Sequence, residues 1–238
     1  MPDNKQEEIQ IRGRSTRMFR GGQGMPLIFL PDTFCFSWLP IHELLSEHYE
    51  VFLPAHPGCA GSEEGFDHFN EIEDMVFHYV DLCEALHLER PIVVGASFGG
   101  WIAAEWAIRY SQALSKLILI DALGLRIPDA PTVDILGIDA GSVRRAIFAD
   151  PRSSLALETI PDTPKSDDII SSLLSRQTLA RFAWQFPDDP RLSRYLYRVT
   201  APTLIIWGEG DSFVSLAHGK TFHQGIAKSK LVVIPTAG

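Results

Sequence analysis

Residues 91–100 read Pro-Ile-Val-Val-Gly-Ala-Ser-Phe-Gly-Gly. The apolar run at 92–94 has the length of a strand and predicts one that is buried on both faces of a sheet. Residues 98–110 predict a helix, which places Ser97 at a strand-to-helix turn. Gly-x-Ser-x-Gly in that context is typical of a nucleophilic serine on a strained turn, where small neighbours let the strand and the helix approach. The alternative is a glycine-rich turn with an incidental serine.

Short apolar runs with strand character recur on both sides of this turn, at 27–30, 51–53, 117–120, 203–207 and 231–234. Helix-sized segments separate most of them, and this alternation implies parallel strands joined by right-handed helical crossovers. The most legible helix is expected to start at Asn70 as N-cap, with Glu73 completing a variant of the capping box. The runs at 9–11 and 16–19 predict an N-terminal hairpin.

The alternation stops between residues 124 and 200. This interval contains seven prolines, and its periodic pieces are helical, with no convincing buried strand. We therefore expect residues 1–123 and 201–238 to form one α/β core, with 124–200 inserted into it as a helical segment. A length of 238 residues is compatible with one domain that carries such an insertion.

Composition excludes several classes of protein. The net charge is −9 and the basic residues form no stripe, so nucleic acid is not an expected partner. No apolar run approaches the roughly 18 residues that cross a bilayer, and the polar residues 1–8 do not form a secretory signal. We expect a cytoplasmic protein without membrane contact. The three cysteines have no Cys-x-x-Cys spacing, which argues against a thiolate metal site or a disulfide framework. The oligomeric state is left open.

A serine nucleophile needs a general base that is oriented by a carboxylate. Residues 207–211 read Trp-Gly-Glu-Gly-Asp and follow the 203–207 strand, so Asp211 is expected at the same sheet edge as Ser97. Asp211 is the candidate acid, and its alternative role is to cap the next helix. Asp121, which follows the 117–120 strand, is the alternative acid.

Four segments together resemble the α/β-hydrolase family over nearly the whole chain: 57–62 (Pro-Gly-Cys-Ala-Gly-Ser), 95–100, 117–121 and 207–211. The resemblance implies an eight-stranded, mostly parallel sheet flanked by helices, with 124–200 as a helical cap over the site. It supports Ser97 and Asp211 as members of a catalytic triad. It implies no cofactor, and no Gly-x-Gly-x-x-Gly or phosphate-binding loop indicates a nucleotide enzyme. The aromatic residues of the cap are expected in an apolar pocket or in the core: Phe182, Trp184, Phe186, Tyr195 and Tyr197.

By this resemblance the oxyanion hole consists of the backbone N–H groups of Thr33 and Phe98. The family usually has His-Gly after its first buried parallel strand, whereas this chain has Pro31-Asp32. An aspartate beside the site places a negative charge where the oxyanion develops, unless it points away or binds a polar group of the substrate. Asp32 is otherwise a turn residue after Pro31.

The family's catalytic histidine follows the last strand, in a segment like 234–238 (Ile-Pro-Thr-Ala-Gly), and we expect it directly beyond Gly238. None of the eight histidines present is a convincing replacement. His218 and His223 are expected at the surface, on different sides of the helix after Asp211. His56 lies in a loop at the active edge of the sheet and is a candidate substrate contact.

These features predict a serine hydrolase that cleaves an ester of a small, partly apolar substrate through an acyl-enzyme on Ser97. The resemblance disfavours the branches of the family that use a carboxylate at the position of Ser97. One alternative is hydrolysis of a carbon–carbon bond in ring-cleavage products, a reaction found in capped members. Another is a non-catalytic binding protein, because the histidine is absent and Pro31-Asp32 departs from the family pattern.

Overall fold

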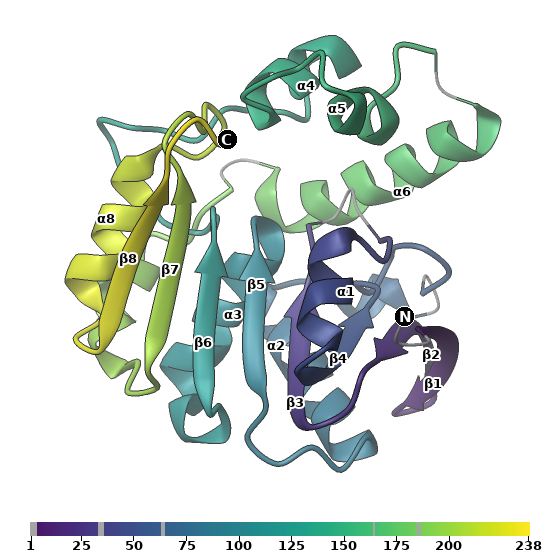
Figure 1. Ribbon diagram of the computed structural model, residues 1–238, viewed down its shortest axis with the longest axis vertical. Coiled ribbons are helices and arrows are strands. Elements are labelled where there is room, and N and C mark those ends of the chain that lie inside the picture. The colour runs from purple at the N-terminus through teal and green to yellow at the C-terminus, as the bar shows by residue number, and fades with distance from the viewer. Residues whose placement is uncertain (1–3, 33–35, 63–64, 164, 185–186) are drawn as a thin grey trace.

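The computed structural model describes residues 4–32, 36–62, 65–163, 165–184 and 187–238 (Figure 1). One sheet of eight strands runs in the order β1-β2-β4-β3-β5-β6-β7-β8. Its strands are β1 (Lys5–Ile11), β2 (Arg14–Gly21), β3 (Met25–Leu30), β4 (Tyr49–Pro54), β5 (Ile92–Ala96), β6 (Lys116–Ile120), β7 (Thr203–Gly208) and β8 (Ser229–Ile234). Strand β2 pairs antiparallel with β1 and with β4, and all other pairs are parallel. The predicted hairpin and the mostly parallel eight-stranded sheet are confirmed.

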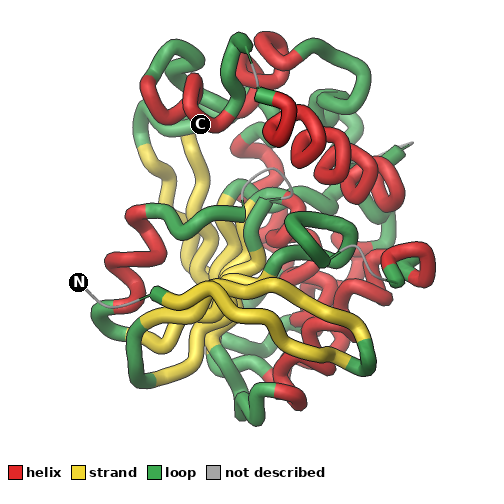
Figure 2. Tube along the Cα trace, turned by 90° about the vertical axis from the view of Figure 1, so that its right-hand side faces the viewer, coloured by secondary structure: helices red, strands yellow, loops and turns green. Residues whose placement is uncertain are grey.

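Helices lie on both faces of this sheet, although one face carries only a single short helix among the described residues. Helix α1 (Pro40–Ser46) packs against β4 on one face, and the opposite face carries α2 (Ile72–Ala85), α3 (Phe98–Tyr110) and α8 (Leu216–Gly225). Figure 2 shows the sheet between these two layers. Single turns of 3₁₀ helix lie at η1 (Phe66–His68), η2 (Ser111–Ala113) and η3 (Leu196–Arg198). The layers leave the carboxyl edge of the parallel strands as the place where loops from several strands meet.

The interval 124–200 is helical, as expected. It contains α4 (Ala140–Ile147), α5 (Ser154–Thr159), α6 (Ser166–Ala183) and α7 (Leu192–Tyr195). In its described part, the one strand-like feature is an isolated bridge between Gly124 and Asp188. Helices α4 to α6 lie above the carboxyl ends of the strands (Figure 1), whereas α7 and η3 pack against α8 and α3. The last part of the interval therefore belongs to the packing of the body.

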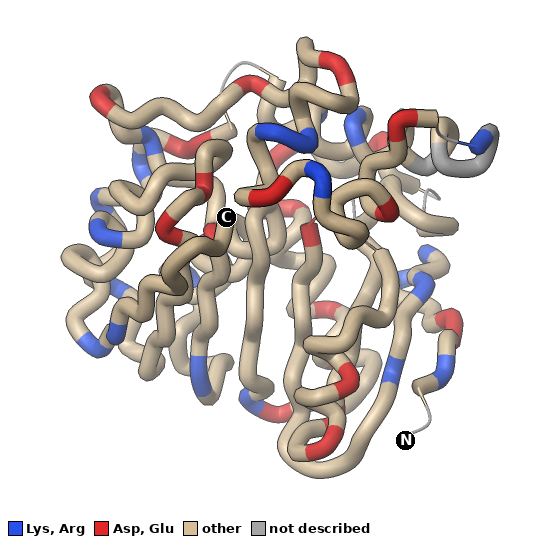
Figure 3. The backbone as a smooth tube through the Cα atoms, turned by 45° about the horizontal axis from the view of Figure 1, so that its top comes forward, with Lys and Arg blue, Asp and Glu red and all other residues tan. Residues whose placement is uncertain are grey.

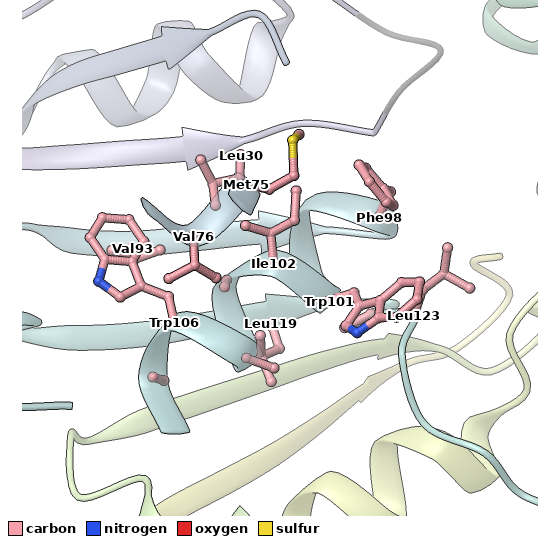
Figure 4. Packing of buried hydrophobic residues seen from close by; sticks show 14 of the residues in the cluster. Leu30, Met75, Val76, Val93, Phe98, Trp101, Ile102, Trp106, Leu119 and Leu123 are labelled. Carbon is pink, nitrogen blue, oxygen red and sulfur yellow. The ribbon is translucent and has the colours of Figure 1, made fainter. Parts of the chain in front are cut away.

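Helix α3 is the centre of the main core. Eleven consecutive residues from Phe98 to Ile108 are buried, because the helix lies between the sheet and α2. Figure 4 shows Trp101, Ile102 and Trp106 of this helix beside side chains of the neighbouring strands. Burial of each large apolar side chain contributes about 1.5–3 kcal/mol. The helix that follows Ser97 is thus rigidly held along its length.

The N-terminus of α2 differs from the expectation. The N-cap is Glu71 rather than Asn70. Asp74 accepts the backbone N–H groups of Asn70 and Glu71 at 2.8 and 2.9 Å, whereas Glu73 forms an ion pair with Arg109 at 2.9 Å. The predicted cap was wrong by one residue because the choice between two neighbouring acidic side chains depends on a partner in α3.

The distribution of charge is mixed. In Figure 3, Lys and Arg positions are scattered among Asp and Glu positions. Within the part of the chain that the structure describes, no helix has the length and apolar character needed to cross a bilayer. The same described residues contain no group of three or more His, Cys, Asp or Glu side chains arranged to hold a metal ion.

Candidate active site

Ser97 occupies a strained turn at the carboxyl end of β5. Its backbone has φ 50° and ψ −114°, a conformation that a residue with a β-carbon rarely adopts. Four hydrogen bonds hold it there: its N–H donates to the Ile120 carbonyl at 2.9 Å, and its carbonyl accepts N–H groups at 3.0–3.2 Å from Gly100, Trp101 and Leu123. Surrounding structure therefore stabilises the strain, as the nucleophile-elbow interpretation requires.

Two glycines next to Ser97 make this turn possible. A β-carbon on Gly95 would lie 2.4 Å from the Gly99 carbonyl oxygen, and one on Gly100 would lie 2.5 Å from the Ala122 β-carbon. Real β-carbons do not approach other atoms so closely, and the neighbours here are main chain or a short side chain. The absence of side chains at Gly95 and Gly100 thus allows β5, β6 and α3 to pack closely.

Of the two backbone N–H groups predicted to form the oxyanion hole, the structure describes one. Phe98 is the first residue of α3, so its N–H has no carbonyl partner within the helix and points out of the helix start. Thr33 lies outside the described residues. The adjoining Asp32 is half-buried at the end of β3. The structure therefore describes the surroundings of the Phe98 donor only, at the first turn of α3.

His56 lies in the loop after β4, but its side chain is buried and both of its ring nitrogens are hydrogen-bonded. It is 1% exposed, its Nδ1 lies 2.5 Å from the Tyr79 hydroxyl, and its Nε2 lies 2.7 Å from the Pro31 carbonyl oxygen. A carbonyl can only accept, so Nε2 carries the proton and Nδ1 accepts from Tyr79. Burial lowers the pKa of His56 to about 4, which keeps the ring neutral. Both ring nitrogens are engaged by protein, so His56 ties the end of β3 to α2.

Sequence reasoning missed this role of His56. The signal in the sequence is its position directly after β4, next to Pro57-Gly58. Its partner Tyr79 comes from α2 and its other partner, Pro31, follows β3. The bonds span 23 and 25 residues of sequence, so only the packing of the three elements brings them together.

Asp211 lies in the turn after β7, and its carboxylate is oriented by main chain. Its Oδ1 accepts the N–H groups of Phe213 and Val214, both at 2.8 Å. Burial raises the pKa of Asp211 to about 7, and the nearby charge of Asp121 adds to this shift, while the two N–H bonds oppose it. These bonds engage Oδ1, which leaves Oδ2 as the atom that can accept from a further donor.

Ser97 and Asp211 are at the same edge of the sheet, as predicted. Strand β6 separates them, because Ala96 pairs with Ile120 and Ile120 pairs with Ile206. Ser97 directly follows Ala96, and Asp211 lies in the turn after the end of β7 at Gly208. Parallel pairing of the three strands therefore brings a residue from the first half of the chain to one from its end.

Asp121 lies between these two positions, at the end of β6. Its backbone φ is +43°, and its Oδ1 accepts the Gly208 N–H at 2.8 Å. Burial raises its pKa to about 6, against the effect of that hydrogen bond. Both aspartates considered as the acid therefore lie at the candidate site, and both are bound to the main chain of β7 or its turn.

The segment after β8 packs directly on the Asp211 turn. The Ala237 carbonyl accepts the Gly210 N–H at 2.7 Å, and the Gly238 carbonyl accepts the Ala149 N–H at 3.1 Å. A β-carbon on Gly238 would lie 2.6 Å from the Asp211 nitrogen. The main chain at Gly238 is thus in van der Waals contact with the residue proposed as the acid.

The aromatic residues of the 124–200 interval have separate environments. Phe182 of α6 packs on Phe98, with ring centroids 5.8 Å apart, and on Phe66. Trp184 is 76% exposed, and Tyr195 and Tyr197 are also exposed. Phe186 lies outside the described residues. Phe182 is therefore the member of this group that reaches the start of α3, where Ser97 is held.

Helix α6 is anchored to the core through Arg181. Its guanidinium donates to the carbonyl oxygens of Phe69 and Asp67, the latter at 2.6 Å, and to Asn70 Oδ1 at 3.0 Å. It also stacks over the Phe66 ring, 5.3 Å from the centroid. These contacts hold the C-terminal half of α6 beside the segment that precedes α2.

The prediction that His218 lies at the surface is wrong. It was expected at the surface, but its side chain is fully buried, with Nδ1 3.2 Å from the Ser215 carbonyl oxygen. His223, five positions further along α8, is exposed as expected. Burial lowers the pKa of His218, while the backbone of Leu125, which follows β6, acts on its ring in the opposite direction, so a segment outside α8 lies against this side chain.

Known proteins resemble this chain over its whole length. The 2-hydroxymuconate semialdehyde hydrolase of Pseudomonas sp. strain CF600 is 27% identical over 260 aligned positions, which cover 100% of this chain and 89% of that protein. Among solved structures, a bacterial membrane phospholipase A superposes with a TM-score of 0.83 at 19% identity, covering 99% of this chain and 79% of that chain.

A third similar protein is the 2-hydroxy-6-oxo-6-phenylhexa-2,4-dienoate hydrolase of Rhodococcus sp. strain RHA1. Its structure superposes with a TM-score of 0.81 at 16% identity and covers 100% of this chain and 92% of that chain. At such identities the two structural matches establish the fold alone. The family model for the alpha/beta hydrolase fold matches residues 30–238, which include the Ser97 turn and the Asp211 turn. The chain therefore belongs to the alpha/beta hydrolase family.

Proposed function

We propose that this protein is a serine hydrolase in which Ser97 is the nucleophile. The observation that carries the proposal is the strained backbone of Ser97 at the β5–α3 turn, held by four main-chain hydrogen bonds. Strain of this kind persists only where the surroundings impose it, and it is concentrated at functional sites. Membership of the alpha/beta hydrolase family supports the same reading.

The proposed reaction begins with attack of Ser97 Oγ on a carbonyl carbon, while a histidine takes the hydroxyl proton. The oxyanion that forms is stabilised by the N–H groups of Phe98 and Thr33. The histidine then returns its proton to the leaving group, and an acyl-enzyme on Ser97 results. A water molecule, deprotonated by the same histidine, attacks the acyl-enzyme and releases the acid. Asp211 orients the histidine and stabilises its protonated form.

The base in this proposal is a histidine directly beyond Gly238. Support comes from the packing of Gly238 on the main chain of the Asp211 turn, because a residue joined to Gly238 would start beside that turn. Sequencing of the gene past the Gly238 codon tests the point directly. A histidine codon there supports the triad, whereas another residue would favour a protein that binds ligands without turnover.

We further propose that residues 124–200 act as a cap that borders the substrate site. The contacts of Phe182 with Phe98 and of Arg181 with the segment before α2 support this role. The substrate would be a small molecule with an apolar portion, accommodated between residues 124–200 and the carboxyl edge of the sheet. Aromatic and aliphatic walls of this kind are usual in small-molecule sites.

Covalent labelling tests the nucleophile. We expect a fluorophosphonate probe to label the protein whose chain continues past Gly238, and Ser97→Ala to abolish the label without loss of the fold. Ser193→Ala, which changes an exposed serine of α7, is the matched control and should label like the wild type. Equal labelling of Ser97→Ala would overturn the assignment of Ser97.

The bond that is cleaved is the finer part of the proposal. Ester hydrolysis is the reaction expected from the sequence. Carbon–carbon hydrolysis is a second candidate, favoured by the full-length similarity to 2-hydroxymuconate semialdehyde hydrolase. Turnover of p-nitrophenyl butyrate is compared with turnover of 2-hydroxymuconate semialdehyde. A higher kcat/KM for the semialdehyde would replace the ester assignment, and Ser97→Ala should lower either activity by at least about 10³-fold.

A further inference from the structure

Asp121 binds the end of β7 with both its main chain and its side chain. Its N–H donates to the Ile206 carbonyl at 3.1 Å, which extends the β6–β7 ladder by one residue. Its Oδ1 then accepts the N–H of Gly208, two residues further along β7, at 2.8 Å. The backbone of Asp121 has a φ of +43°, which a residue with a β-carbon rarely adopts.

Gly208 is the residue from which the Asp211 turn begins. Its carbonyl oxygen lies 3.4 Å from the Asp211 nitrogen, so the Gly208 peptide is linked to Asp121 on one side and to Asp211 on the other. A β-carbon on Gly208 would lie 2.7 Å from the Ala237 carbonyl oxygen. The turn is therefore confined between β6 and the segment after β8.

The two carboxylates are also coupled by charge. Asp121 raises the pKa of Asp211 beyond the effect of burial, because a second negative charge nearby disfavours ionisation. Among the described titratable side chains, Asp121 is the one whose charge acts on Asp211 in this way. From the β8 side, the main chain of Gly238 packs on the same turn.

We propose that Asp121 is a positioning residue for the acid: through the Gly208 peptide it sets the place of Asp211, and it keeps its own carboxylate close to that of Asp211. The role of Asp211 in catalysis rests on the proposed function, whereas the link between the two aspartates does not. Asp121 thus acts through Asp211 and Gly208.

Two substitutions separate charge from hydrogen bonding. Asp121→Asn keeps an oxygen that can accept the Gly208 N–H but removes the charge, and Asp121→Ala removes both. Asp129→Asn, in an exposed loop that follows the same strand, removes an equal charge from the surface and is the matched control. All three variants are made in the same 238-residue chain.

The first readout is the titration of the Asp211 carboxyl carbon by NMR. We expect a midpoint near 7 in the wild type and in Asp129→Asn, and a lower midpoint in Asp121→Asn. The second readout is hydrogen exchange of the Gly208 amide. Asp121→Ala should accelerate it by about tenfold or more, because a hydrogen bond to a charged group is lost, whereas Asp121→Asn should not.

An unchanged Asp211 midpoint in Asp121→Asn overturns the proposal, and so does unchanged Gly208 exchange in a folded Asp121→Ala. If Asp121→Ala does not fold, the Asp211 midpoint in Asp121→Asn decides alone. Neither readout requires turnover, so the proposal can fail while Ser97 still labels with the fluorophosphonate, and it can hold in a chain that hydrolyses nothing.

Discussion

Gly99 stands against the end of β3 so closely that a β-carbon at residue 99 would lie 2.2 Å from the Leu30 carbonyl oxygen. The same β-carbon would lie 2.6 Å from the Pro31 carbonyl oxygen. This approach brings the first turn of α3, with the Phe98 N–H, next to the chain that leads from β3 towards Thr33. The geometry of the proposed oxyanion hole depends on it.

Substitution Gly99→Ala should therefore destabilise the fold. The obstructing atoms are backbone, which cannot move aside like the end of a flexible side chain, and we expect a loss of about 1–3 kcal/mol or more in the free energy of unfolding. Denaturant unfolding measures it. Gly137→Ala is the matched control, because its nearest neighbour would be at 3.7 Å and the change should be small. A Gly99→Ala variant as stable as Gly137→Ala would contradict the packing argument.

His56→Ala should destabilise the protein by about 2–4 kcal/mol at pH 7.5, because it leaves the Tyr79 hydroxyl and the Pro31 carbonyl buried without their partner and opens a cavity. Urea unfolding is the measurement. His68→Ala, at a position 75% exposed, should change stability by no more than about 0.5 kcal/mol.

The effect of His56→Ala should also depend on pH. Burial lowers the pKa of His56 to about 4, below the ordinary value of 6.5, so the folded state binds fewer protons than the unfolded state between these values. The stability that neutral His56 contributes is present above pH 6.5 and is lost as the pH falls towards 4. The difference between wild type and variant should shrink over that window, and a constant difference would show that the ring is not held neutral.

The contribution of Asp211 to stability should depend on pH in the opposite direction. Its pKa is raised to about 7 from 3.8, so the folded state binds more protons than the unfolded state between these values. The stability that protonated Asp211 contributes is complete below about pH 4 and is lost as the pH rises to about 7. Because asparagine stays neutral, the Tm of Asp211→Asn should increase relative to that of the wild type as the pH rises through this window. Calorimetry at pH 4, 5.5 and 7.5 checks the trend.

Arg181→Ala should loosen the contact between α6 and the segment before α2. The guanidinium donates to two carbonyl oxygens and to Asn70, and the loss should cost about 1–3 kcal/mol and increase proteolysis near residues 66–70. Arg152→Ala, at an exposed arginine elsewhere in the 124–200 interval, is the control. Equal protease resistance of the two variants would argue against Arg181 as an anchor.

Much of the architecture could be predicted from local patterns. The apolar runs at 92–94 and 117–120, and the helix expected over 98–110, lie where β5, β6 and α3 are found. Strand length, periodicity and the flanking glycines are properties of neighbouring residues, so a single chain displays them. The Gly-x-Ser-x-Gly motif belongs to the same class, because it reports a turn that five adjacent residues make.

Partners and burial could not be predicted in the same way. Glu73 was expected to cap α2, yet it pairs with Arg109. His218 was expected at the surface, yet it is fully buried. In each case the sequence displays the chemistry of the side chain, while the packing of another element decides whether it faces water, an ion or a carbonyl.

The sequence by itself thus determined the parallel sheet, the position of Ser97 at a strand end, and the presence of Asp211 at the same edge. Only the tertiary structure decided that His56 is locked between Pro31 and Tyr79, and that Asp121 holds Gly208 rather than standing alone after its strand. The physical reason is that these bonds join residues 23 to 87 positions apart. Their formation depends on how strands and helices pack, which no local pattern encodes.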